Sequence, residues 1–213
     1  MPEEKFNKFS VPLGLLDYVN PVLYTTTMIT IIKNIGYKMI YPFNHYLFYG
    51  VVISAIFGFI IPTGKVLVGL GVIKFSMPVG LVLGTNIGIL ISGLTLIHYA
   101  LKMSVQTLGI IILVILAFLI FIYFKTKKFN TVAVLTGAIG YMFIYISLII
   151  MAVRKEMIIP IILYGMAISL FVTLCAIGIK SNLKNPKVHW AIEIMNVLCQ
   201  LLVCISTFIL FSR

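Results

Sequence analysis

Seven long apolar runs, separated by short polar segments, constrain this chain more than any other feature. A helix needs about 20 mostly apolar residues to cross a hydrocarbon core about 30 Å thick. The runs are Val11–Ile32, Tyr46–Pro62, Val79–Leu101, Gln106–Phe124, Thr131–Val153, Met157–Ile179 and His189–Phe211. They predict an all-α integral membrane protein in which residues 1–213 form a single bundle of seven transmembrane helices, with no soluble domain.

The number of spans has two alternatives, six and eight, because of the region around the second run. Tyr46–Pro62 is short for a span, and Pro62-Thr63-Gly64 is expected to end it. The following apolar stretch, Val66–Ile73, has only eight residues and is flanked by Lys65 and Lys74. It predicts an interfacial or re-entrant turn, or part of an eighth span if it joins a neighbouring run.

The composition excludes soluble classes of protein. Apolar residues make up 62% of the chain and charged residues only 10%, against about 25% charged in soluble domains. The net charge of +11 does not indicate nucleic-acid binding, because the basic residues lie almost entirely between the apolar runs. There they act as topology signals and contact anionic lipid headgroups. The expected location is a membrane, with the cell membrane favoured.

The distribution of Lys and Arg predicts the orientation. With seven spans, the side that holds the N-terminus carries ten basic residues, Lys65 included, and the other side carries six. An excess of basic residues marks the cytoplasmic side, so the N-terminus is expected in the cytoplasm and the C-terminus outside. Two very short loops, Lys102–Val105 and Arg154–Glu156, predict tightly packed antiparallel helix pairs on either side of them.

The last run carries a stripe of polar residues. Their spacings of three and four residues place them on one helix face: His189, Glu193, Asn196, Gln200, Cys204 and Thr207. Such a face is costly to expose to lipid and must meet other helices or water. Two interpretations of this face stay open. It could form hydrogen bonds to other helices, or it could line a pathway for a solute or ion.

The first run mirrors this stripe with Asp17, Asn20, Tyr24 and Thr27 on one face. Pro21 has no backbone N–H, so the carbonyl of Asp17 loses its helical donor and a local break is expected there. Transporters use such breaks to expose carbonyl groups to cations.

Asp17 and Glu193 are the only acids within any predicted span, and no Lys or Arg is predicted inside a span to pair with them. At least one is therefore expected to be protonated or to bind a cation. The predicted proton or cation site combines these acids with Asn20 and Asn196, and it continues through Tyr24 and Gln200. Asn86 of the third run is added as a wall of the cavity between helices one, three and seven. The hypothesis requires the first and seventh helices to be neighbours.

Small residues form a ridge on the third run, with Gly80, Gly84, Gly88 and Ser92 each four residues apart. Close backbone approach at small residues supplies much of the helix packing in lipid. The ridge predicts a tight bundle, and it also suits contact with a partner subunit or a second copy of the chain. Lining a cavity is the alternative.

No enzyme motif stands out. The three His residues are isolated, no Cys-x-x-Cys occurs, and no nucleophile–base set is suggested by spacing, so no catalytic residue, metal or cofactor is predicted. The favoured function is transport of a small solute or ion, with proton or cation coupling as a further expectation. The alternatives are a non-enzymatic subunit, sensor or ligand-binding module that acts with a partner, and an intramembrane enzyme.

Overall fold

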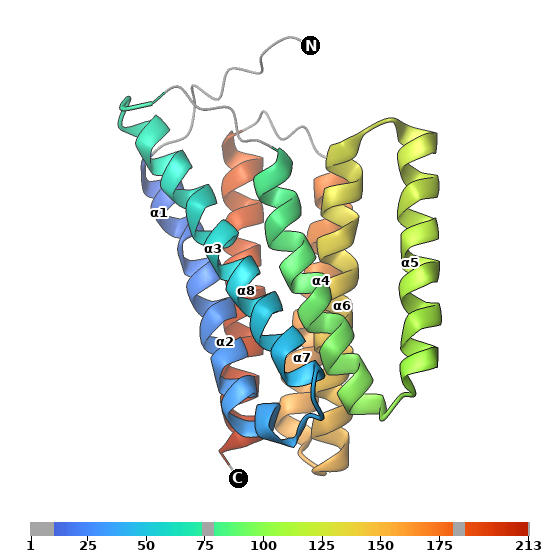
Figure 1. The fold of residues 1–213 in the computed structure, drawn as a ribbon. Coiled ribbons are helices and arrows are strands. Elements are labelled where there is room, and N and C mark those ends of the chain that lie inside the picture. The colour runs from blue at the N-terminus through green and yellow to red at the C-terminus, as the bar shows by residue number, and fades with distance from the viewer. Residues whose placement is uncertain (1–10, 74–78, 181–185, 213) are drawn as a thin grey trace.

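The computed structural model describes residues 11–73, 79–180 and 186–212, which form an antiparallel bundle of helices with no strand among them (Figure 1). The elements are α1 (Val11–Asp17), α2 (Val19–Ile35), η1 (Gly36–Lys38), α3 (Phe43–Gly69), α4 (Val79–Leu101), α5 (Val105–Thr126), α6 (Phe129–Arg154), α7 (Ile158–Lys180) and α8 (Pro186–Phe211). Six of the described helices, α3 to α8, are each long and apolar enough to cross a membrane. Together with α1 and α2, which follow the first predicted span, they agree with a count of seven.

The first span is divided at Tyr18, where α1 ends and α2 begins. Pro21 cannot donate to the carbonyl of Asp17, and the hydrogen bond from Val22 to the Tyr18 carbonyl is long at 3.3 Å. The expected break next to Asp17 is therefore present. It leaves Asp17 at the C-terminal end of a short helix and Asn20 in the first turn of the next.

The second span does not end at Pro62, which corrects the prediction from the sequence. Helix α3 continues through Pro62 to Gly69, so Lys65 and most of the predicted interfacial turn belong to the helix. Close packing accounts for the continuation, because a Cβ added at Gly14 would lie 2.9 Å from the Val66 side chain. The hydroxyl of Thr63 also donates to the Phe59 carbonyl at 2.7 Å and contacts the hydroxyl of Tyr18 at 2.6 Å.

The centre of the bundle is made by α4, which packs closely against both α3 and α6. A Cβ at Gly88 would lie 2.5 Å from the backbone nitrogen of Ser54, and one at Gly140 would lie 2.7 Å from that of Leu90. The ridge on α4 thus meets α3 at Gly88 and Ser92, whereas Gly80 at its end has no neighbour within 4 Å of an added Cβ. Association of the chain with a partner through this ridge stays a prediction.

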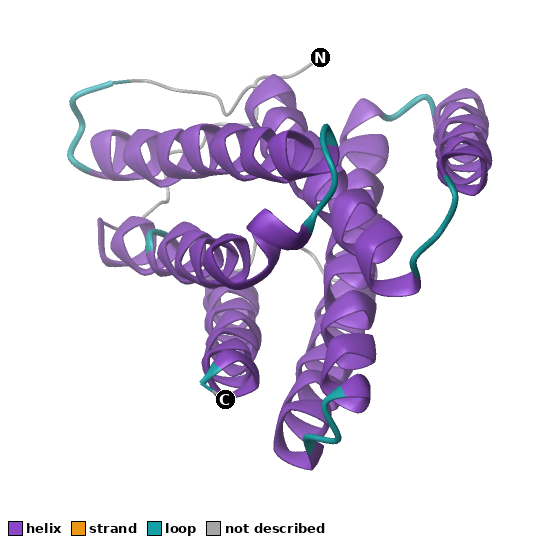
Figure 2. Ribbon diagram, turned by 60° about the horizontal axis from the view of Figure 1, so that its bottom comes forward, coloured by secondary structure: helices purple, strands orange, loops and turns teal. Residues whose placement is uncertain are grey.

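Helix α5 stands apart from the bundle (Figures 1 and 2). It packs on α6, and it keeps most of its apolar side chains exposed, among them Leu113 and Phe121 at 67% and 60%. The prediction that the short loop before α5 packs it tightly against α4 is therefore wrong. The prediction for the other short loop is confirmed, because α6 and α7 pack together.

Helix α8 lies beside α2 and α7 and also contacts α1. The first and last spans are thus neighbours, which is the arrangement that the site hypothesis requires. The chain alternates direction from one span to the next, so the start of α1 and the end of α8 lie at opposite ends of the bundle (Figure 1).

Candidate functional site

Asp17, Lys65 and Glu193 meet near the end of the bundle where α1 begins. The ammonium nitrogen of Lys65 lies 2.5 Å from Asp17 Oδ2 and 3.5 Å from Glu193 Oε1. The Asn20 side-chain amide donates to Glu193 Oε2 at 3.4 Å. We call these four residues the ion cluster. Four helices supply it. Asp17 ends α1, Asn20 lies in the first turn of α2, Lys65 lies in the last part of α3, and Glu193 lies in the first half of α8.

All three ionisable side chains are buried, with exposed fractions between 9% and 12%. Buried charges are tolerated when they are paired and hydrogen-bonded, and Lys65 pairs with both acids. The expectation that the acids have no basic partner inside the membrane is wrong. The expectation was wrong because Pro62 was expected to end the helix, which placed Lys65 in a loop. Helix α3 continues past Pro62, so Lys65 lies within it.

The ion cluster is asymmetric in charge and geometry. If all its groups are ionised, two carboxylates face one ammonium, which leaves one negative charge. Asp17 holds Lys65 at hydrogen-bond distance, whereas Glu193 lies an ångström farther from the same nitrogen and shares a long contact with Asn20. The Asn20 carboxamide oxygen is buried without a hydrogen-bond partner. Of the two acids, Glu193 lies farther from the Lys65 ammonium, and it lies next to the buried Asn20 oxygen.

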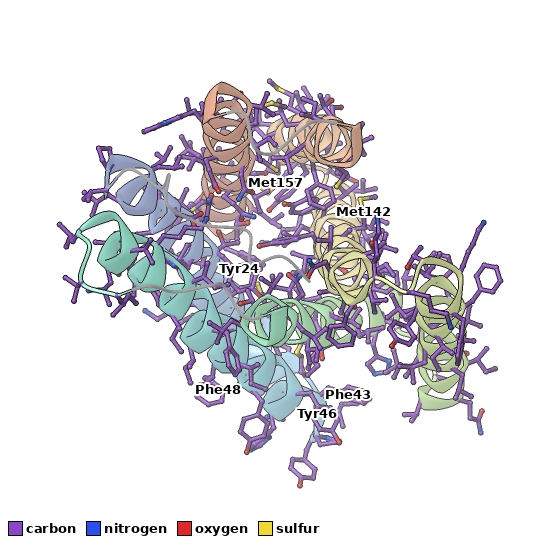
Figure 3. All side chains as sticks on the ribbon, turned by 90° about the horizontal axis from the view of Figure 1, so that it is seen from above. Tyr24, Phe43, Tyr46, Phe48, Met142 and Met157 are labelled. Atoms are coloured by element: carbon purple, nitrogen blue, oxygen red, sulfur yellow. The ribbon has the colours of Figure 1, made fainter. Side chains whose placement is uncertain are left out.

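Tyr24 follows Asn20 one turn farther along α2 and lies in the middle of the bundle (Figure 3). Its side chain is 6% exposed, and its ring packs edge-on against that of Tyr141 at 6.1 Å. Its hydroxyl is buried near the hydroxyls of Ser54 and Ser92, without a hydrogen bond at ordinary length. Buried polar groups are normally satisfied, so this position suits a water molecule or a small polar ligand.

The polar stripe of α8 continues below Glu193. Gln200 is buried beside the hydroxyl of Tyr141, and Asn196 is half-buried between Glu193 and Gln200 on the helix. Next to Gln200, the Cys199 thiol donates to the Ala167 carbonyl at 3.3 Å, and two turns farther along the Thr207 hydroxyl lies 3.0 Å from that of Tyr164. The lower half of α8 thus bonds to α7, as expected for a face that joins helices.

Asn86 does not belong to the ion cluster. Its side-chain amide donates to the Ala133 carbonyl of α6 at 2.7 Å, and the carboxamide lies directly against Gly137. Its contacts therefore join α4 to α6. The seven residues named from the sequence separate into three that meet around Lys65, three that continue along α2 and α8, and Asn86 elsewhere.

Comparison with known proteins finds no matching family model, no matching curated protein and no matching solved structure. Within residues 11–73, 79–180 and 186–212, no three His, Cys, Asp or Glu side chains are grouped as a metal site would require. The chemistry available at the described site is that of carboxylates, an ammonium, carboxamides and buried tyrosine hydroxyls.

Proposed function

We propose that this protein is a membrane transporter or channel for a small solute or ion, and that the ion cluster is its proton- or cation-exchanging site. The observation that carries the proposal is the sharing of one buried ammonium, that of Lys65, between two buried carboxylates. Each carboxyl group can bind or release a proton, so the charge of the ion cluster can change when a proton or a monovalent cation binds. We expect the protein to lie in the cell membrane.

In this proposal Glu193 is the exchanging group and Asp17 is the constant partner of Lys65. Protonation or cation binding at Glu193 would weaken its attraction to Lys65 and to Asn20. Because these contacts connect α8 to α3 and α2, ion occupancy would change how firmly α8 is held against its neighbours. Ion binding can change the position of a helix only if that helix makes different contacts in the ion-bound and ion-free states.

The polar groups below the ion cluster support a pathway between α2 and α8. Asn20 and Tyr24 each carry a buried polar atom without a hydrogen-bond partner, and Tyr141 and Gln200 lie farther along the same interior. Polar groups buried at membrane depth commonly mark ion pathways or proton relays.

The decisive experiment is flux through proteoliposomes that contain the purified protein and a pH-sensitive dye, under imposed gradients of H⁺, Na⁺ or K⁺. We expect Glu193→Gln to fold normally and to lower flux about tenfold or more, as expected when a charge-assisted interaction is lost. Asp17→Asn is expected to lower stability as well, because it removes the short contact with Lys65.

Glu156→Gln is the matched control, since Glu156 is exposed in the turn between α6 and α7. It should leave flux unchanged. Absence of flux in the wild-type protein under every gradient would contradict transport, and equal flux in Glu193→Gln would remove the ion cluster from the mechanism.

The second candidate function is a non-enzymatic subunit, sensor or ligand-binding module that acts with a partner. The observation that favours it is α5, which contacts α6 and otherwise presents apolar side chains outwards. A partner helix could occupy the space beside α5, and co-purification of a partner subunit that is lost on substitution of α5 residues would favour this alternative.

A further inference from the structure

The last turns of α2 and α8 enclose an open groove at the end of the bundle opposite the ion cluster. Its volume is about 640 Å³, and its lining comprises Thr26, Ile29, Thr30, Lys33, Asn34, Phe208, Ile209, Phe211 and Ser212. The two helices pack side by side, so the groove runs along their contact. It shares no residue with the ion cluster.

The groove carries polar and apolar side chains along its length, and its one lysine lies at its outer end. Lys33, Asn34 and Ser212 lie at the ends of their helices, whereas Ile29 and Phe208 lie about one turn farther in. The latter two side chains are 45% and 49% exposed. Two exposed apolar side chains about one turn inside a cationic group match the order of acyl chain and phosphate in a phospholipid.

Lys33 is the group in this groove that can attract an anion. Lys33 is exposed. The hydroxyl groups of the groove donate to backbone carbonyls of their own helices, Thr30 to Thr26 at 2.9 Å and Ser212 to Ile209 at 2.9 Å. The Asn34 amide donates to the Thr30 carbonyl at 2.8 Å. The ammonium of Lys155, which lies 5.2 Å from the centre of the Phe211 ring, donates to the Leu210 carbonyl at 2.8 Å.

We propose that this groove binds an anionic phospholipid, with its phosphate at the Lys33 ammonium and an acyl chain along Ile29 and Phe208. Charge complementarity selects an anionic headgroup, and the exposed apolar wall selects a lipid over a soluble phosphate. Each Lys near a membrane surface contributes about 1 kcal/mol of attraction to anionic lipid, which corresponds to about fivefold in affinity.

The test is native mass spectrometry of the purified full-length protein with two lipids that share the same palmitoyl and oleoyl chains. One lipid is a phosphatidylglycerol and the other a phosphatidylcholine. We expect the wild-type protein to retain phosphatidylglycerol about fivefold more strongly, and Lys33→Gln to remove this preference. Ile29→Trp, which fills the groove from an exposed position, should weaken retention of both lipids.

Lys38→Gln is the matched control, because Lys38 is also exposed near this end but lies against the Tyr37 ring and does not line the groove. It should keep the preference. Equal retention of the two lipids by the wild-type protein would overturn the proposal, whatever the variants do. An equal loss in Lys38→Gln would show general surface charge instead of a site. Competition by glycerol phosphate at the same concentration would show that a free phosphate, and not a lipid, is recognised.

Discussion

At the scale of single residues, Lys65 determines how two acids can lie inside an apolar bundle. Its ammonium contacts Asp17 and Glu193, and each of these three side chains is about nine-tenths buried. Removing one member of a buried ion pair leaves an uncompensated charge, whereas replacing all the charges by neutral groups of similar shape is far less costly. The cluster should therefore respond non-additively to substitution.

We expect Lys65→Met to lower the free energy of unfolding by about 3–5 kcal/mol, because two buried carboxylates lose their cation. Adding Asp17→Asn and Glu193→Gln to this variant should restore most of the stability. Reversible unfolding in detergent micelles measures both effects. Lys125→Met, at an exposed position in the last turn of α5, serves as the control and should change little. A triple variant no more stable than Lys65→Met would refute the charge argument.

At the scale of elements, α4 depends on small residues where it crosses α3 and α6. The contact at Gly88 is with backbone atoms of Ser54 and Gly50, which cannot move aside as a flexible side chain can. In contrast, the atoms nearest to an added Cβ at Gly84 belong to the Phe57 ring, and one at Gly80 would meet nothing within 4 Å. The four members of the predicted ridge therefore differ in how much packing depends on them.

We expect Gly88→Ala to destabilise the bundle by about 1–3 kcal/mol, since overpacking forces the helices apart. Gly80→Ala should be neutral or stabilise by up to about 1 kcal/mol, because alanine is the better helix former and the site is open. Thermal unfolding of both variants in the same lipid nanodiscs provides the comparison. Equal effects at the two positions would mean that the α3–α4 contact does not limit stability.

At the scale of the whole molecule, the odd number of spans puts the start of α1 and the end of α8 at opposite ends of the bundle (Figure 1). The correction at Lys65 removes that residue from the loop charges on the N-terminal side, which leaves nine basic residues there against six on the other. Of the basic residues on the two sides, Lys5, Lys8, Lys74, Lys184 and Arg213 lie outside the described residues. The bias keeps its direction, so a cytoplasmic N-terminus remains the prediction.

Reporter fusions test this orientation in cells. Alkaline phosphatase fused after the C-terminus should be active, because it folds only outside the cytoplasm, and a fusion in the turn at Lys127 should be inactive. Green fluorescent protein at the same two positions should give the opposite pattern. A C-terminus on the same side as Lys127 would contradict the seven-span topology.

The apolar runs and polar stripes of the sequence were sufficient to predict the helical class, the long apolar helices and the two acid-bearing faces, but not the end of the second span. These features depend only on residues close together in the chain. The length of a span is determined by the hydrocarbon thickness, and the residues on one helix face are determined by 3.6 residues per turn. The break before Asn20 followed from Pro21 in the same way.

Other features depended on contacts between residues far apart in the chain. Helix α3 passes Pro62 because Gly14 and Asp17 of α1 pack against its end, and Lys65 thereby enters the bundle. The carboxamide of Asn86 is satisfied by Ala133, and α5 stands apart although its loop is short. The sequence by itself therefore determined which faces must avoid lipid. Only the tertiary structure decided which groups meet there, because pairing of buried charges depends on distances between helices that no local pattern encodes.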